Sequence, residues 1–278
     1  MVKKILKRIK RGKKSILSAN PYLLHEKEKG LVKKSFYFPG SNGRAVLLLH
    51  GWSTTPYELR RLGGFLNEAG YTVYGPLLSG HGTVYTDLEN VRYEDWLRDA
   101  ELAFEKLKKE HQKVFVGGTS MGANIALCLA KEKGEISGVI LMATPYKIKF
   151  EKVSGLFAKF LSGFKKYHRK FYPPTFGSST TITRLISYQK YPLKNLLELG
   201  ELVKKSRENL HLVKQPCLLL QSKHDHIITK NSLDKLYEKI GSKNKKKKYI
   251  EKAYHTFISD IRNEHIFEDI LNFLSENK

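Results

Sequence analysis

One serine lies in a sequence that could expose its hydroxyl for nucleophilic attack. Ser120 is the centre of Gly118-Thr-Ser-Met-Gly122, a G-x-S-x-G sequence between the apolar run 114–116 and the small, aliphatic segment 123–130. A strand, a sharp turn and a helix in this order form a nucleophile elbow, in which the turn presents the serine. Glycines suit both flanking positions because strand and helix pass too close there for side chains. The segment therefore predicts a nucleophilic serine.

A serine hydroxyl needs a base to take its proton and an acidic side chain to orient that base. In a parallel sheet, such groups gather just after the carboxyl ends of the strands. Asp225 follows the predicted strand 216–221, and His255 follows the predicted strand 247–251. The chain order Ser120, Asp225, His255 is the order expected of an α/β-hydrolase triad.

Other residues compete for the acid and for different chemistry. Asp260 is the alternative acid, although it follows His255 by only five residues and is expected to begin the last helix. His224 and His226 flank Asp225, which raises the alternative of a metal site. An extended backbone would point these two imidazoles away from the carboxylate, and no other cluster of ligand-type residues supports a metal.

Acyl transfer also requires donors for a developing negative oxygen. The backbone N–H of Met121, directly after the serine, is one candidate. The second is expected in the loop after an early strand, and we assign it to the N–H of Trp52, which follows the apolar run 45–49. His50 and His81 adjoin glycines in loops of this kind, and we expect them to brace these loops through hydrogen bonds.

The elements that position these residues follow from hydrophobic periodicity. Strands and helices alternate up to residue 145 and again from residue 216, which predicts a mostly parallel central sheet flanked by helices. Strands are expected at 33–38 (an edge strand), 45–49, 71–74, 114–116, 138–142, 216–221 and 247–251, and helices at 55–70, 93–109, 123–130, 193–205, 232–240 and 263–274. Thr55 is expected to cap the first of these helices. Leu102 is expected in the buried stripe of the second, and Lys245–Lys248 in a solvated loop that enters the last strand.

The chain divides into three parts. Residues 1–30 form a basic N-terminal extension, 31–145 and 213–278 form the α/β core, and 146–212 form a helical lid inserted between late strands. Four lid residues at helical spacing could cover an acyl chain or pack within the lid itself: Phe157, Phe160, Leu161 and Phe164. Aromatic and basic residues in this insertion leave open a stacking surface for single-stranded nucleic acid.

The formal net charge of +23 arises from 50 Lys and Arg against 27 Asp and Glu. Such an excess could serve nucleic acid or an anionic membrane, but lysines spread along the whole chain and no nucleic-acid motif accompanies them, which disfavours nucleic acid. Residues 1–14 place eight Lys or Arg beside apolar residues at helical spacing, which permits peripheral contact with anionic lipid. No signal peptide or run of about 18 apolar residues is present, so a cytoplasmic location, with or without such contact, is expected. Cys128 and Cys217 lie in apolar runs and are expected to be buried thiols.

The motifs resemble those of the bacterial and archaeal carboxylesterase and monoacylglycerol lipase family of α/β-hydrolases. The resemblance lies in Leu-Leu-Leu-His50-Gly-Trp52, in Ser-Gly-His81-Gly-Thr83, in the G-x-S-x-G sequence and in Asp225 with His255. It implies an α/β-hydrolase fold, with Ser120 as nucleophile, His255 as base, Asp225 as orienting acid, and the amides of Trp52 and Met121 as oxyanion donors. It also implies hydrolysis of short- to medium-chain esters or monoacylglycerols without a cofactor.

Two alternatives to this function stay open. The same triad could transfer acyl groups to another acceptor, or cleave thioesters or peptides. A basic binding protein on a hydrolase scaffold would belong to a different class, and it would have no need for all three triad residues.

Overall fold

The computed structural model describes residues 26–148, 165–170 and 182–277. The basic segment 1–14 and the four proposed lid residues Phe157, Phe160, Leu161 and Phe164 lie outside these ranges. Among the described residues, no helix is both long and apolar enough to cross a bilayer.

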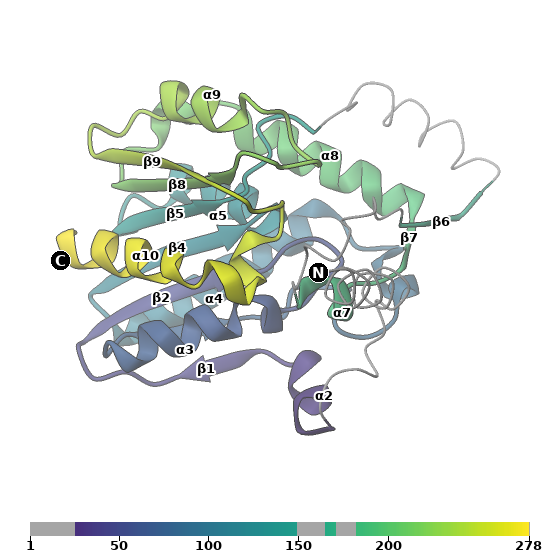
Figure 1. The fold of residues 1–278 in the computed structure, drawn as a ribbon, viewed down its shortest axis with the longest axis horizontal. Helices are drawn as coiled ribbons and strands as arrows, with labels where there is room; N and C mark the ends of the chain where they lie inside the picture. Colours follow the sequence, from purple (N-terminus) through teal and green to yellow (C-terminus); the bar gives the residue numbers. More distant parts are fainter. Residues whose placement is uncertain (1–25, 149–164, 171–181, 278) are drawn as a thin grey trace, which may run out of the picture.

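A seven-stranded sheet forms the centre of the molecule (Figure 1), in the order β1-β3-β2-β4-β5-β8-β9. Its strands are β1 (Phe36–Phe38), β2 (Arg44–Leu49), β3 (Thr72–Gly75), β4 (Lys113–Thr119), β5 (Gly138–Met142), β8 (Cys217–Ser222) and β9 (Lys245–Ile250). Neighbouring strands are parallel throughout, except that the edge strand β1 pairs antiparallel with β3. The mostly parallel sheet expected from the sequence is therefore confirmed.

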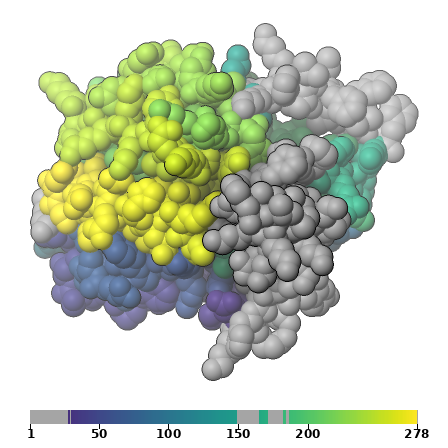
Figure 2. All heavy atoms as spheres, in the orientation of Figure 1, coloured from purple at the N-terminus to yellow at the C-terminus, as the bar shows by residue number. Residues whose placement is uncertain are grey.

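Helices cover both faces of this sheet, so the central strands are apolar on both sides. In β2, Ala45, Leu47 and Leu49 face one core, and Val46 and Leu48 face the other. The first core is closed by α4 (Tyr93–Glu110), α5 (Met121–Glu132), α8 (Leu193–Arg207) and α9 (Ser232–Lys239). The second is closed by α3 (Arg60–Glu68) and α10 (His265–Glu276), the blue and yellow helices on the face seen in Figure 2. Two buried cores on one sheet hold the strand ends in fixed positions.

Several smaller elements lie near the carboxyl ends of the strands. They include α2 (Glu26–Val32), α7 (Thr183–Ile186) and an antiparallel pair, β6 (Tyr167–Arg169) with β7 (Lys190–Pro192), which the sequence did not predict. Short 3₁₀ turns occupy Pro56–Leu59, Tyr85–Leu88, Leu210–Leu212, Phe257–Ser259 and Ile261–Asn263. From β7 the chain enters α8, which packs along α5 and brings the region after residue 190 into contact with the main core.

Two local predictions are wrong, and a third holds in part. Thr55 lies at the N-cap position with Pro56 in the first turn, as predicted, but the element that begins there is a 3₁₀ turn and the Thr55 hydroxyl makes no capping bond. Leu102 is 64% exposed, since it lies about 200° around the helix from the buried Ala100. Lys245–Lys248 lie within β9 rather than in a loop.

The lysines of β9 suit its place at the edge of the sheet. Lys246 pairs with Glu276, Lys247 with Asp234 at 2.6 Å, and Lys248 with Asp269 at 2.6 Å. Each exposed pair contributes at most about 1 kcal/mol. Charged side chains along an edge strand also discourage pairing with another chain.

Candidate active site

The elbow at Ser120 lies between β4 and α5 and has a strained backbone. Ser120 has φ 53° and ψ −115°, a conformation that L residues rarely adopt, and its N–H donates to the carbonyl of Met142 at 2.9 Å. A Cβ on Gly118 would come within 2.2 Å of the carbonyl carbon of Gly122, and a Cβ on Gly122 within 2.0 Å of the carbonyl oxygen of Leu49. The two glycines therefore let the helix start against the strand ends.

His255 connects Ser120 to Asp225. Its Nε2 lies 2.9 Å from Ser120 Oγ, and its Nδ1 lies 2.7 Å from Asp225 Oδ2. His255 and Asp225 are buried, while Ser120 is half-buried. The three residues selected from the sequence are thus brought together by loops after β4, β8 and β9.

Asp225 is held as a carboxylate. Burial raises the pKa of its carboxyl group. The charge and hydrogen bond of His255, together with the amides of Ile228 and Ile227, lower the pKa by more than burial raises it, so it lies below its usual value. Those amides donate to Asp225 Oδ1 at 3.0 and 2.8 Å. An ionised Asp225 fixes the proton of His255 on Nδ1 and leaves Nε2 free to accept the serine proton.

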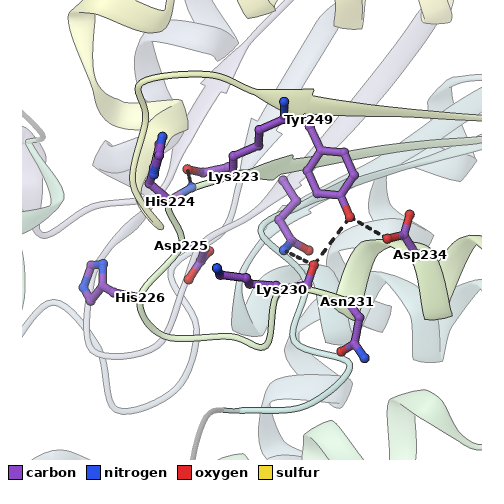
Figure 3. Close-up of a pocket in the computed structure, with 10 residues that line it drawn as sticks. Lys223, His224, Asp225, His226, Lys230, Asn231, Asp234 and Tyr249 are labelled. Carbon is purple, nitrogen blue, oxygen red and sulfur yellow. Dashed lines mark hydrogen bonds between the residues drawn. The ribbon is translucent and has the colours of Figure 1, made fainter.

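The competing residues take other places. Asp260 accepts the N–H of Arg262 at 3.1 Å and pairs with its guanidinium at 2.5 Å, so it caps the 3₁₀ turn before α10 rather than orienting the base. His224 and His226 border a polar hollow of about 700 Å³ beside Asp225, and their rings lie well apart (Figure 3). Within the described ranges, no three His, Cys, Asp or Glu residues cluster closely enough to hold a metal ion.

The loop Gly51–Ser53 lies against the start of α5. A Cβ on Gly122 would also lie 2.7 Å from the carbonyl oxygen of His50, and a Cβ on Gly51 would lie 3.5 Å from the carbonyl oxygen of Thr119. The N–H of Gly51 donates to Glu58 Oε1 at 2.5 Å, and the N–H of Ser53 donates to His81 Nε2 at 3.0 Å. The amide between them belongs to Trp52, the residue selected from the sequence.

His50 and His81 brace this loop, as their glycine-rich settings predict. His50 Nδ1 lies 2.8 Å from the carbonyl oxygen of Gly51, and its Nε2 accepts the N–H of Leu78 at 3.2 Å. His81 Nδ1 lies 2.9 Å from the carbonyl oxygen of Ser79. Burial lowers the pKa of His81 to about 4, and burial together with the charge of His81 lowers the pKa of His50 well below its usual value. Both rings are therefore neutral near pH 7, as acceptance of an N–H requires.

Comparison with known proteins identifies this arrangement. A family model described as serine aminopeptidase, S33 matches residues 40–262. The chain belongs to this family. A carboxylesterase of Bacillus subtilis (strain 168) is 29% identical over 251 residues, which are 89% of this chain and 98% of the relative. A thermostable monoacylglycerol lipase of Bacillus sp. (strain H-257) is 30% identical over 243 residues, 86% of this chain and 94% of the relative.

Solved structures agree with this assignment. A structure from work on LipS and LipT, two metagenome-derived lipolytic enzymes, superposes with a TM-score of 0.81 at 25% identity and covers 88% of this chain and 98% of that one. The monoacylglycerol lipase of Paleococcus ferrophilus superposes with a TM-score of 0.73 over 88% of this chain and 98% of that one; at 19% identity it supports the fold alone. The chain has an α/β-hydrolase fold and is an enzyme of the esterase and lipase type.

In this S33-family enzyme, residues from beyond β5 contact the Gly51–Ser53 loop. Asn195 of α8 accepts the indole N–H of Trp52 at 2.7 Å, and the Tyr191 ring meets the indole edge to face with centroids 4.8 Å apart. The N–H of Tyr188 donates to the carbonyl of Ser53 at 2.8 Å, and Lys170 donates to the hydroxyl of Ser53. The region between β5 and β8 therefore holds the loop from one side.

Glu58 holds the same loop from the other side, and sequence analysis missed it. Glu58 is 4% exposed, and burial raises its pKa to about 7 against the opposing hydrogen bonds of Gly51 and Thr183 and the charges of His255 and Lys170. Burial likewise lowers the pKa of Lys170 to about 8, and the Glu58 carboxylate opposes this shift. A signal was present in the sequence, because Glu58 lies four positions before the core residue Leu62 and so on the apolar face.

The glycine at position 122 gives a first prediction. Gly122→Ala is expected to destabilise the protein by about 3 kcal/mol, because the new methyl group would collide with the backbone carbonyl of Leu49, which has little room to move. Urea unfolding measures the change. Gly134→Ala is the matched control, since nothing lies within 4 Å of its Cβ position. Equal stability of the two variants would contradict the close approach.

The raised pKa of Glu58 gives a second prediction. Its folded pKa of about 7 exceeds the ordinary value of 4.5, so the folded protein binds this proton more tightly than the unfolded chain does. The contribution of Glu58 to stability therefore falls as pH rises from 4.5 through 7. Glu58→Gln removes this titration. The unfolding free energy of the variant, relative to wild type, should rise by up to about 3 kcal/mol between pH 4.5 and pH 8. Urea unfolding at several pH values tests this, and a constant difference across that interval would refute it.

Proposed function

We propose that this enzyme is a serine carboxylic-ester hydrolase that works through Ser120, His255 and Asp225 and a covalent acyl-enzyme. The observation that carries the proposal is the position of His255, with one ring nitrogen 2.9 Å from the serine hydroxyl and the other 2.7 Å from a buried carboxylate. Family membership and the carboxylesterase and monoacylglycerol lipase relatives support it.

Acylation follows from this geometry. Ser120 Oγ attacks the ester carbonyl carbon while His255 Nε2 takes the hydroxyl proton, and the imidazolium that forms is stabilised by the Asp225 carboxylate. The amides of Met121 and Trp52 donate to the carbonyl oxygen as it becomes negative. His255 then returns the proton to the alkoxide oxygen, the C–O bond breaks and the alcohol leaves.

Deacylation uses the same groups with water as the nucleophile. His255 Nε2 takes a proton from water, which attacks the acyl carbon, and the proton then passes to Ser120 Oγ as the acid leaves. The chain's own residues supply the base, the orienting acid and the oxyanion donors that this cycle requires.

The substrate class follows from the relatives and from the residues around the loop. Trp52 and Tyr191 place two half-buried aromatic side chains beside the proposed oxyanion amide, an apolar surface suited to the carbon chain of an ester. Short- to medium-chain esters or monoacylglycerols are therefore the proposed substrates.

Hydrolysis of p-nitrophenyl esters from acetate to palmitate tests the proposal. Ser120→Ala is expected to lower kcat by at least about 10⁴-fold on every ester that wild type cleaves, because it removes the nucleophile. Ser41→Ala, which changes an exposed serine between β1 and β2, is the control and should keep wild-type rates. The chain length that wild type cleaves fastest separates an esterase from a lipase. A folded wild type that cleaves no ester would overturn the proposal.

The family description favours one second candidate, a peptidase that uses the same triad. Aminoacyl p-nitroanilides and acyl thioesters, assayed beside the oxygen esters, distinguish the two. A kcat/KM on an anilide or thioester above that on every oxygen ester would transfer the assignment to the peptidase or thioesterase activity.

A further inference from the structure

A buried carboxyl group that the catalytic cycle does not use lies directly behind the proposed oxyanion loop. Glu58 follows the loop by one 3₁₀ turn, and its two oxygens bind groups from different parts of the chain. Oε1 accepts the N–H of Gly51 at 2.5 Å, and Oε2 lies 2.9 Å from the hydroxyl of Thr183 in α7. The Gly51 peptide directly precedes the Trp52 amide.

We propose that Glu58 is a positioning residue that sets the direction of the Trp52 amide by holding the preceding peptide and linking it to α7. This inference rests on the proposed ester hydrolysis, because Glu58 acts through an amide that becomes important only when an oxyanion forms. Glu58 does not touch the reacting atoms in this role.

The backbone of the Gly51–Ser53 loop is strained. Ser53 has φ 63°, so the loop turns sharply in a conformation that local preferences do not favour. Its shape must therefore be held by contacts from outside. His81 holds the Ser53 amide, Asn195 holds the Trp52 indole, and Glu58 is the group that holds the amide before Trp52.

The hydrogen-bond chain beyond Glu58 explains why a carboxyl group fits this place. Thr183 Oγ1 lies 2.7 Å from Ser259 Oγ, which lies 3.1 Å from the carbonyl oxygen of Thr256, the residue after His255. With a proton on Oε2, Glu58 donates to Thr183, Thr183 to Ser259 and Ser259 to Thr256, so every hydroxyl proton is used. Without that proton, Thr183 donates to Glu58 instead. Gly51 keeps its acceptor in both states.

The same chain joins the oxyanion side of the site to the base. It runs from the loop after β2, through α7, to the turn that follows His255. The charge of His255 also lies near enough to lower the pKa of Glu58. A displacement of Glu58 would therefore act directly on the Gly51 amide beside the proposed oxyanion donor. It would reach the turn after His255 only through Thr183 and Ser259.

Two substitutions at position 58 separate positioning from folding. Glu58→Gln keeps an acceptor for Gly51 and can donate to Thr183, as the protonated carboxyl does. Glu58→Met has similar length but no acceptor. It leaves the Gly51 amide unpaired and also removes a buried ionisable group, so its fold is verified by circular dichroism and urea unfolding before it is assayed. We expect Glu58→Met to lower kcat about 10- to 100-fold with KM changed less than about threefold, because oxyanion contacts act in the transition state. Glu58→Gln should stay within about threefold of wild-type kcat.

Two further readouts exclude a merely structural role. The affinity of an alkyl trifluoromethyl ketone, which forms a tetrahedral adduct with the serine, should fall in Glu58→Met by about the same factor as kcat/KM. Amide hydrogen exchange in the Gly51–Ser53 loop should accelerate in Glu58→Met and stay slow in Glu58→Gln. Wild-type kcat in a folded Glu58→Met, an effect on KM alone, or an equal loss in both variants would overturn the inference.

Wild type and Ser120→Ala, assayed in parallel, separate this outcome from failure of the proposed function. Ester hydrolysis that depends on Ser120 but not on the acceptor at position 58 refutes only the positioning role. Absence of Ser120-dependent hydrolysis in wild type refutes the proposed function, and the inference falls with it. If Glu58→Met does not fold, Thr183→Val serves instead. It keeps Glu58 and its bond to Gly51 but removes the Oε2 partner together with the contact to Ser259, and it should lower kcat about three- to tenfold at unchanged KM. Wild-type kcat in that variant would overturn the inference.

Discussion

The contact between the first turn of α5 and the end of β2 is the constraint on which the site depends. With no side chain at Gly122, the helix backbone lies directly on the carbonyl groups of Leu49 and His50. This approach gives Ser120 its strained turn, and it also brings the loop after β2 beside the first amides of α5. The N-terminus of a helix carries a partial positive charge, so a developing oxyanion there would be stabilised by more than the Met121 amide alone. The proposed nucleophile and the proposed oxyanion donors thus share one geometric origin.

The Gly51–Ser53 loop belongs to no helix or strand, and side chains hold its polar groups in place. Glu58, His81 and Asn195 reach it from three different segments of the chain. Groups that are fixed before the reaction need no reorganisation when charge develops, which is the physical basis of preorganised stabilisation. Two of these three side chains are buried ionisable groups. Burial raises the pKa of Glu58 and lowers the pKa of His81, and both shifts favour the neutral form of the side chain. His81 therefore braces the loop as a neutral ring, whereas Glu58 exchanges its proton near neutral pH.

Much of the fold, and the three side chains that meet at Ser120, could be predicted from sequence because their signals are local. The apolar runs located the five inner strands of the central sheet, and the glycine spacing around Ser120 located the elbow. Asp225 and His255 were found because each follows a strand directly. Leu102 and Lys245–Lys248 were misplaced because composition alone does not show which side of a helix turns outward, or that lysines with acidic partners can continue an edge strand.

The role of Glu58 was out of reach for a different reason. Its partners Gly51 and Thr183 lie 7 and 125 positions away, and the second pairing exists only after α7 has folded over the core. The local signal, a glutamate in line with Leu62, marks burial but names no partner. The small β6-β7 sheet was missed likewise, since it joins two three-residue strands that lie 21 positions apart between β5 and β8.

The presence of an acid at this buried position has an energetic explanation. An apolar residue at position 58 would leave the Gly51 amide and the Thr183 hydroxyl without their acceptor, and each unpaired buried group costs about 1 to 3 kcal/mol. A carboxylate gives both groups an acceptor, but burial removes it from water at a cost in free energy. The raised pKa of Glu58 reflects this desolvation. Burial outweighs the hydrogen bonds and positive charges that favour the carboxylate, so the pKa of Glu58 rises to about 7. Because Oε1 accepts from Gly51 with or without the proton on Oε2, the peptide before Trp52 keeps its anchor through that titration.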